Sequence, residues 1–156
     1  MDTPYEKLLV SLALAKVRFI IVGGVAVALN GFIRTTEDVD ILIERSPDNI
    51  ETLLTALGSF GKGHARELVP EDFDETEGAV RVIEEFPLDI FVVMQGNSYH
   101  DLIRETSQTE IKGTPVTYLN AAGLIRLKQN SSREKDRIDI AALKDAQLGH
   151  LNRESG

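Results

Sequence analysis

Short runs rich in Val and Ile recur along the chain, and most are separated by segments with helical features. The runs at residues 17–22, 38–43 and 88–93 are predicted to be buried strands, because they are short and mostly apolar. Another run at 79–84 precedes the last of these across a turn at 85–87, which predicts a hairpin. Strands that alternate with helices predict an α/β (α+β) fold, a mixed sheet with helices packed on it. The hairpin argues against a purely parallel, doubly wound sheet.

Capping residues and apolar spacing predict the helices. Thr3 is a candidate N-cap with Pro4 at the first helical position, and Ser46, Asn120 and Ser132 are further candidate N-caps. The expected helices cover residues 4–16, 25–30, 46–57, 99–105, 120–129 and 132–148. An edge strand is expected near 65–68, a loop or short turn around 71–77, and a strand or hairpin over 109–119.

Length and composition limit the class of protein. A chain of 156 residues with 42% hydrophobic residues fits a single domain over 1–156, with a core at about 17–94 and a C-terminal helical part at about 120–148. Disulfides are excluded because there is no cysteine. No apolar stretch is long enough to cross a bilayer, and the acidic start with Asp2 and Glu6 does not resemble a signal peptide. A cytoplasmic protein without membrane attachment is expected.

The charge is negative but uneven. A net charge of −8 disfavours extended nucleic-acid binding, since an acidic surface repels phosphate backbones. Residues 126–137 are the exception, with five cations against two anions. This basic segment suits a small polyanion such as a triphosphate, and a solvated helix face would have the same composition.

The second predicted strand carries two carboxylates. Because side chains alternate along a strand, Asp38 and Asp40 lie on one face, roughly 6.5–7 Å apart, while Val39, Ile41 and Ile43 point to the core. Carboxylates this close repel unless a cation lies between them, and oxygen ligands suit Mg²⁺. The alternative is a strand edge with exposed acids.

Two other features bear on this pair. Asp72 and Asp74 have the same spacing but lie in an acidic run without an apolar strand, so they are predicted to be a solvated loop. Gly23-Gly24 lies at a strand-to-helix junction, where glycine and a helix N-terminus favour close approach of a phosphate. A plain tight turn is the alternative reading, because no dinucleotide or P-loop pattern accompanies the two glycines.

Together these residues resemble a known signature. Val22-Gly23-Gly24, followed by the Gly-x-x-Arg-x-Thr-x-Asp-x-Asp pattern of Gly31 to Asp40, is similar to the DNA polymerase beta-like nucleotidyltransferase superfamily. The pattern resembles the small prokaryotic branch that includes AbiEii-type toxins. That superfamily uses a third carboxylate on a later strand, and Asp89 matches it within an apolar run, where an unpaired charge would be costly.

The resemblance implies a metal-dependent enzyme that transfers NMP from an NTP to a hydroxyl acceptor. Asp38, Asp40 and Asp89 would be the catalytic residues and would bind Mg²⁺, with Mn²⁺ as a substitute. Asp89 would share a second ion or accept the proton of the attacking hydroxyl. Nucleotide phosphates would be bound by residues from three segments: Gly23, Gly24, Arg34, Thr36 and Lys128.

Several questions stay open at this stage. A protein, an RNA end and a small molecule are the alternatives for the acceptor, and the small size of the chain suggests that a partner protein takes part in recognising it. Val25 departs from the small or hydroxyl residue that many active members have after the glycine pair, and the gap from Gly24 to Asp38 is long. A catalytically degenerate nucleotide-binding or toxin–antitoxin module is therefore the first alternative. A structural domain with merely solvated acids is the second.

Overall fold

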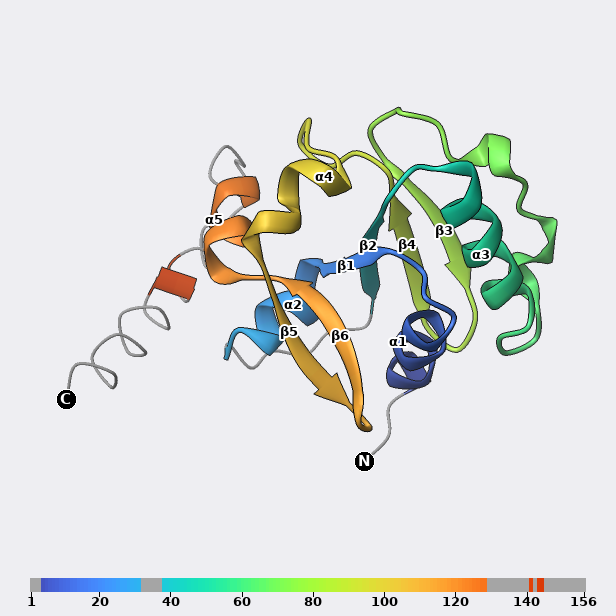
Figure 1. Cartoon of the computed structure of the whole chain (residues 1–156), viewed down its shortest axis with the longest axis horizontal. Helices are drawn as coiled ribbons and strands as arrows, with labels where there is room; N and C mark the ends of the chain where they lie inside the picture. Colours follow the sequence, from blue (N-terminus) through green and yellow to red (C-terminus); the bar gives the residue numbers. More distant parts are fainter. Residues whose placement is uncertain (1–3, 32–37, 129–140, 142, 145–156) are drawn as a thin grey trace.

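The computed structural model describes residues 4–31, 38–128, 141 and 143–144, and Figure 1 shows the whole chain. The described residues form a six-stranded sheet in the order β3-β4-β2-β1-β6-β5. The strands are β1 (Phe19–Val22), β2 (Val39–Ile43), β3 (Ala79–Ile83), β4 (Pro87–Phe91), β5 (Thr106–Ile111) and β6 (Thr114–Leu119).

The sheet is mixed, as predicted. β1 pairs antiparallel with β2 and parallel with β6, whereas β2 pairs parallel with β4. The hairpins β3–β4 and β5–β6 form the two ends of the strand order. This arrangement confirms the predicted α+β class.

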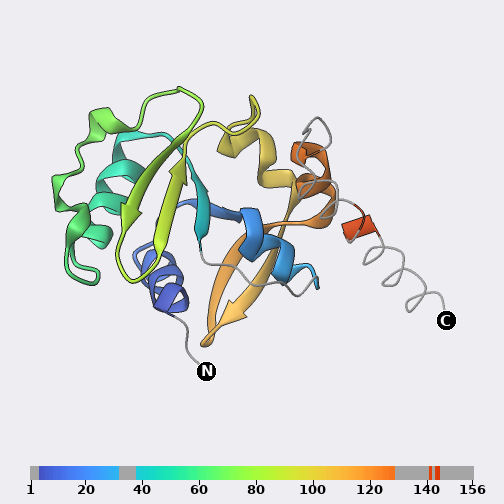
Figure 2. The ribbon, with the colours of Figure 1, turned by 180° about the vertical axis from the view of Figure 1, so that it is seen from behind.

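Helices lie on both faces of the sheet. They are α1 (Pro4–Leu14), α2 (Gly23–Leu29), α3 (Pro47–Gly58), α4 (Tyr99–Leu102) and α5 (Ala121–Lys128), with short 3₁₀ turns η1 (His64–Glu67), η2 (Pro70–Asp72) and η3 (Ile103–Glu105). Figures 1 and 2 show α1 and α3 over one face of the sheet and α2 towards the other. From behind, β3 and β4 have no helix drawn in front of them (Figure 2).

The central strands hold the core because they are buried on both faces. Every residue of β1 is buried, and so are all residues of β2 except Asp40. On α3, the apolar positions Ile50, Leu53 and Leu57 are buried, as their helical spacing requires. Runs of Val and Ile without strict alternation thus correspond to strands covered on both sides.

Several predicted helix boundaries are confirmed by the capping contacts. The Ser46 hydroxyl accepts a hydrogen bond from the Asn49 backbone N–H at 3.3 Å, and α3 begins at the next residue. Asn120 Oδ1 accepts from the Gly123 N–H at 3.0 Å, and α5 follows it. Gly31 ends α2 with a φ of 101°, a conformation that suits glycine.

Two of the local predictions were wrong. The segment expected to form an edge strand near 65–68 is the 3₁₀ turn η1, held by Glu84, which accepts backbone hydrogen bonds from Lys62 at 3.1 Å and His64 at 2.9 Å. Helix α2 begins at Gly23, two residues earlier than expected, so both glycines belong to its first turn. The helix predicted at 132–148 falls largely outside the described residues.

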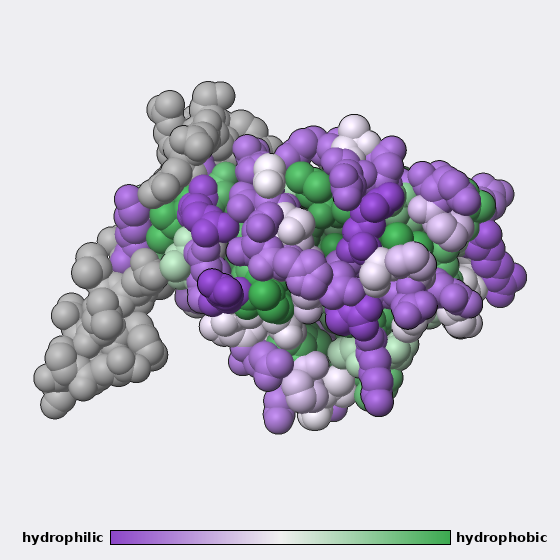
Figure 3. All heavy atoms as spheres, turned by 45° about the horizontal axis from the view of Figure 1, so that its top comes forward, coloured by the Kyte–Doolittle hydropathy of each residue, from purple (hydrophilic) through white to green (hydrophobic). Residues whose placement is uncertain are grey.

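One face of the molecule can be judged for polarity in a space-filling view. Figure 3 shows a face dominated by hydrophilic residues, with apolar residues visible in separate patches. Among the described helices, none combines the length and the apolarity that crossing a bilayer would require.

Candidate functional site

The pairing of β2 with β4 brings the predicted acids together. These strands are parallel, and Asp40 is the register partner of Asp89. Side chains at paired positions lie on the same face of a sheet, so both carboxylates project from one side. Asp38 comes two residues before Asp40, immediately before the start of β2. The sheet therefore places Asp40 and Asp89, from distant parts of the sequence, beside one another.

A cationic side chain that was not among the predicted site residues, that of Arg81, lies next to these acids. Arg81 of β3 is the antiparallel register partner of Asp89. Its Nε donates to Asp89 Oδ1 at 2.8 Å and its Nη2 donates to Asp89 Oδ2 at 2.9 Å, a bidentate pair. The same Nη2 lies 3.4 Å from Asp38 Oδ2. Arg81 thus connects the acids of β2 and β4.

This pairing explains how Asp89 can be buried. The residue is only 8% exposed, and an unpaired carboxylate at that depth would be strongly unfavourable. The hydrogen bonds to Asp89, followed by the charges of Asp89, Asp38 and Asp40, raise the pKa of Arg81 above its already high value. The guanidinium is therefore a permanent positive charge at this place.

The glycine turn adjoins the same cluster. Val22 is the register partner of Asp40, and Gly23 follows it with a φ of 66°. A Cβ atom added to Gly23 would overlap the Asp40 carboxylate. Glycine at this position therefore satisfies two demands, a left-handed backbone and space for the carboxylate of Asp40.

The structure describes only some of the other residues that were predicted to contact phosphate. Gly24 lies in the first turn of α2, beside Gly23. Lys128 is the last residue of α5, which packs against α2 and β6, and its side chain is half-buried. Arg34 and Thr36 lie outside the described residues. Their roles, like that of Lys128, remain predictions.

The carboxylates that were predicted to bind a metal do not form a ready set of ligands. Within the part of the chain that the structure describes, no three Asp, Glu or His side chains are arranged as a ready set of metal ligands. The donor chemistry fits, because Asp38, Asp40 and Asp89 offer carboxylate oxygens on adjacent strands, as Mg²⁺ prefers. The arrangement differs from a ready site because Arg81 holds both oxygens of Asp89.

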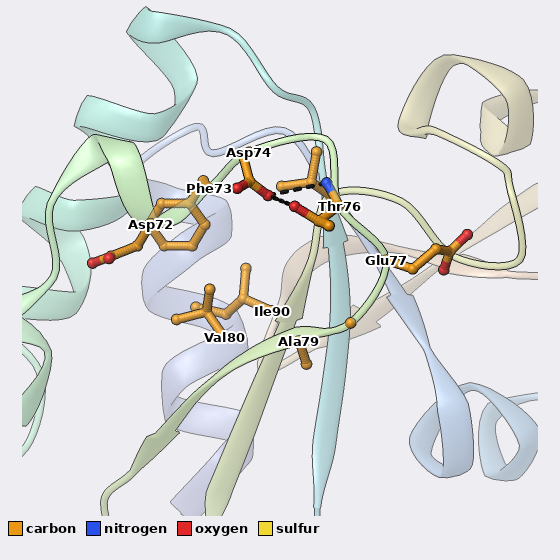
Figure 4. Close-up of a pocket in the computed structure, with 10 residues that line it drawn as sticks. Asp72, Phe73, Asp74, Thr76, Glu77, Ala79, Val80 and Ile90 are labelled. Atoms are coloured by element: carbon orange, nitrogen blue, oxygen red, sulfur yellow. Dashed lines mark hydrogen bonds between the residues drawn. The ribbon is translucent and has the colours of Figure 1, made fainter.

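The second Asp-x-Asp pair is an exposed loop, as predicted. Asp72 accepts a hydrogen bond from the Val69 N–H at 2.9 Å, and Asp74 accepts from the Thr76 N–H at 3.0 Å and from its hydroxyl. Figure 4 shows Asp74 directed at Thr76, above a cavity of about 140 Å³ lined by Phe73 and residues of β3 and β4. The hydrogen bonds of Asp72 and Asp74 therefore stabilise the local conformation of this segment.

Other titratable groups also have structural partners. His64 Nδ1 lies 2.6 Å from the Ile83 carbonyl oxygen, and His100 Nε2 lies 3.4 Å from Glu44. In the basic segment, Arg126 pairs with Glu105 and donates to Asn97 at 3.0 Å. At the described start of this segment, Arg126 is therefore an exposed but ion-paired side chain, and the remainder from residue 129 to 137 is not described.

Arg81 could have been found from the hairpin register. It is the one charged residue in the run Ala79-Val80-Arg81-Val82-Ile83. A turn centred on Glu85 places it opposite Asp89, whereas the predicted turn at 85–87 is centred one residue later and places it opposite Phe91. The sequence pattern therefore misplaced the centre of the turn by one residue, and this error hid the pairing of Arg81 with Asp89.

Comparisons with solved structures define the class of fold. An antigenic nucleotidyltransferase-like protein from Paracoccidioides brasiliensis superimposes with a TM-score of 0.54 at 20% identity, over 88% of this chain and 74% of that one. The antibiotic-resistance factor ANT(2'')-Ia gives a TM-score of 0.54 at 14% identity, over 99% of this chain and 95% of that one. The fold is that of nucleotidyltransferase-like proteins.

The family follows from the sequence match. Residues 5–149 match the family described as nucleotidyltransferase of unknown function (DUF6036), and the chain belongs to that family. A search of curated proteins found no match. The predicted nucleotidyltransferase resemblance is therefore confirmed, while the likeness to the AbiEii-type branch stays a prediction.

Proposed function

We propose that this chain is a metal-dependent nucleotidyltransferase that transfers NMP from an NTP to a hydroxyl acceptor. One observation carries the proposal: Asp40 and Asp89 lie side by side on adjacent strands next to the turn at Gly23, and Arg81 lies between Asp89 and Asp38. Membership of a nucleotidyltransferase family supports the reaction class. Neither observation identifies the acceptor, so its chemistry is left open.

Asp38, Asp40 and Asp89 are the residues that would hold the divalent ion. When bound, such an ion neutralises triphosphate charge and stabilises the entering and leaving oxygens at the α-phosphate. The chain's own part is placement: β2 holds Asp40 beside Asp89 of β4, and Asp38 comes immediately before β2. Rigid strands hold such groups more accurately than loops do.

The glycine turn would contribute room and backbone donors. The absence of a side chain at Gly23 makes room for the Asp40 carboxylate, and the backbone N–H groups at the start of α2 would be the donors to a phosphate. Gly24, Arg34, Thr36 and Lys128 are the further proposed phosphate contacts. Transfer then joins the acceptor oxygen to the α-phosphorus and breaks its bond to the bridging oxygen, so that pyrophosphate leaves. The acceptor's proton passes to a base, for which Asp89 is the candidate once Arg81 has released it.

A nucleotide-binding module without turnover, including a toxin–antitoxin partner, is the second candidate. It is favoured by the same bidentate Arg81–Asp89 pair, which neutralises the acid without a metal. In a degenerate member this pair would be permanent. The two candidates differ in whether a nucleotidyl group is transferred.

The experiment that separates them uses α-labelled NTPs with Mg²⁺ and a panel of protein, RNA and small-molecule acceptors. The enzyme hypothesis predicts labelled product and pyrophosphate, with both lost in Asp38→Ala and Asp40→Ala. Asp72→Ala and Asp74→Ala serve as matched controls and should retain transfer. Nucleotide binding without transfer across the whole panel would favour the module.

A further inference from the structure

The Arg81 guanidinium lies between the carboxylates, where a divalent metal ion is proposed to bind. It bonds both oxygens of Asp89 and lies 3.4 Å from Asp38, with the charge of Asp40 also acting on it. We propose that Arg81 is an internal cation that competes with the divalent ion for Asp89 and Asp38, so that loading the site requires the guanidinium to leave Asp89. This inference rests on the proposed function.

The guanidinium and the divalent ion compete because both need the carboxylate oxygens of Asp89 and because both are positively charged. Asp89 is 8% exposed, and its two oxygens already accept from Nε and Nη2 of Arg81. Mg²⁺ requires close, nearly octahedral oxygen contacts, which a bidentate guanidinium on the same carboxylate obstructs. A guanidinium and a divalent ion in contact with the same oxygens would also repel each other.

Arg81 is placed so that it can leave. It lies on β3, the end strand of the sheet, and its side chain is 51% exposed, against 12% for the side chain of Asp89. The hydrogen bonds of its guanidinium go to Asp89 and Asp38 alone among the described residues. A rotation of its own flexible side chain into solvent is therefore sufficient, and the strand pairing of β3 with β4 can stay as it is.

A different role for Arg81 would have the opposite consequence. If Arg81 instead held Asp89 in the orientation that the ion needs, it would be a positioning residue, and its removal would weaken metal binding. If Arg81 competes, its removal strengthens metal binding. The sign of the change therefore distinguishes the two roles, independently of any catalytic measurement.

The first test is calorimetric titration of the metal-stripped protein with Mn²⁺, without nucleotide. Arg81→Gln removes the guanidinium charge, and we expect its Mn²⁺ affinity to be about tenfold higher than that of the unaltered chain, the equivalent of one charge-assisted contact. Arg18→Gln is the matched control, because Arg18 is similarly exposed (47%) and pairs with Glu44. Its affinity should stay within about twofold, as screened charges act weakly at a distance.

A second measurement detects the displacement directly. In the metal-free protein, the Nε–H of Arg81 should give a protected NMR signal, because it is bonded to Asp89. Saturating Mg²⁺ should shift that signal to the position of a solvated arginine. Asp38→Asn, which removes a proposed ligand, should abolish the Mg²⁺-dependent shift while leaving the Arg81 signal protected.

Clear results would overturn the inference. An equal or lower Mn²⁺ affinity in Arg81→Gln would do so, and so would an Arg81 Nε–H signal unchanged at saturating Mg²⁺, or no metal binding by either protein. These outcomes concern Arg81 and the ion. The proposed function fails on a different result, namely that no nucleotidyl group is transferred to any acceptor. Competition without transfer, or transfer without competition, would therefore tell the two apart.

Discussion

Two Asp-x-Asp pairs in this chain have identical spacing and different surroundings. Asp38 and Asp40 flank the first residue of a buried central strand, whereas Asp72 and Asp74 lie in an exposed segment at the end of η2. The loop acids accept hydrogen bonds from residues two or three positions away. The strand acids meet residues from elsewhere in the sequence, namely Gly23, Asp89 and Arg81.

The difference shows which information gives a carboxylate pair a chemical role. Spacing alone predicts only that two side chains share a face. The strand pair gains a third acid and a countercharge because β2 lies between β1 and β4 in the sheet. The loop pair has no such neighbours, and its acids stabilise local turns.

Isosteric removal of one charge should give the largest effect. Asp40→Asn keeps the shape of the side chain but removes a proposed metal ligand, and we expect nucleotidyl transfer to fall about 10²–10³-fold. Asp74→Asn is the matched change in the loop and should leave kcat/KM within about twofold. Steady-state kinetics with a labelled NTP measures both. Equal losses in the two variants would remove the distinction between the pairs.

The glycine turn provides the second test. Gly23→Ala forces a φ of 66° on alanine and places a methyl group against the Asp40 carboxylate, so we expect a loss of about 2–3 kcal/mol in the free energy of unfolding. Gly113→Ala is the control, because its φ is 80° but a Cβ there meets open space. It should lose only about 1 kcal/mol from backbone strain. Urea unfolding checks this difference, and equal losses would mean that contact with Asp40 contributes nothing.

The loop pair should affect stability but not activity. Asp72 accepts from the Val69 N–H at the start of η2, and Asp72→Ala should lower the free energy of unfolding by about 0.5–1 kcal/mol. Nucleotidyl transfer should be unchanged. A large loss of activity in this variant, with stability preserved, would show that the loop belongs to the functional site.

The smallest effect concerns pH. The side-chain and backbone hydrogen bonds from Thr76 hold the pKa of Asp74 below its ordinary value of 3.8. Because the pKa is lowered on folding, the stabilising contribution is present above the ordinary value and is lost as the pH falls through the folded value. NMR titration should show this lowered pKa, and Thr76→Val should raise it towards 3.8. An unchanged pKa in Thr76→Val would contradict the local role of the loop pair.

Much of the fold could be predicted because its signals are local. Ser46 and Asn120 mark helix starts, and the Val and Ile runs mark the buried strands. The segment near 65–68 was predicted wrongly, because its conformation depends on backbone contacts with Glu84, about twenty residues away. Such tertiary contacts override local propensity.

The site was predictable in its residue types but not in its pairing. The motif resemblance identified Asp38, Asp40 and Asp89 as candidates, and the pairing of β2 with β4 places Asp40 and Asp89 side by side. The involvement of Arg81 depends on a one-residue register in the β3–β4 hairpin, which the sequence pattern did not fix. Strand registers and side-chain partners depend on the assembled sheet.

The most direct measurement is a crystal structure with Mn²⁺ and a nonhydrolysable NTP, with the metal located by its anomalous scattering. Convergence of distant carboxylates predicts a peak within bonding distance of Asp38 and Asp40, with Asp89 turned to the same ion and Arg81 withdrawn from it. A peak held by Asp72 and Asp74, or a nucleotide bound away from β2 with the Arg81–Asp89 pair intact, would contradict the account.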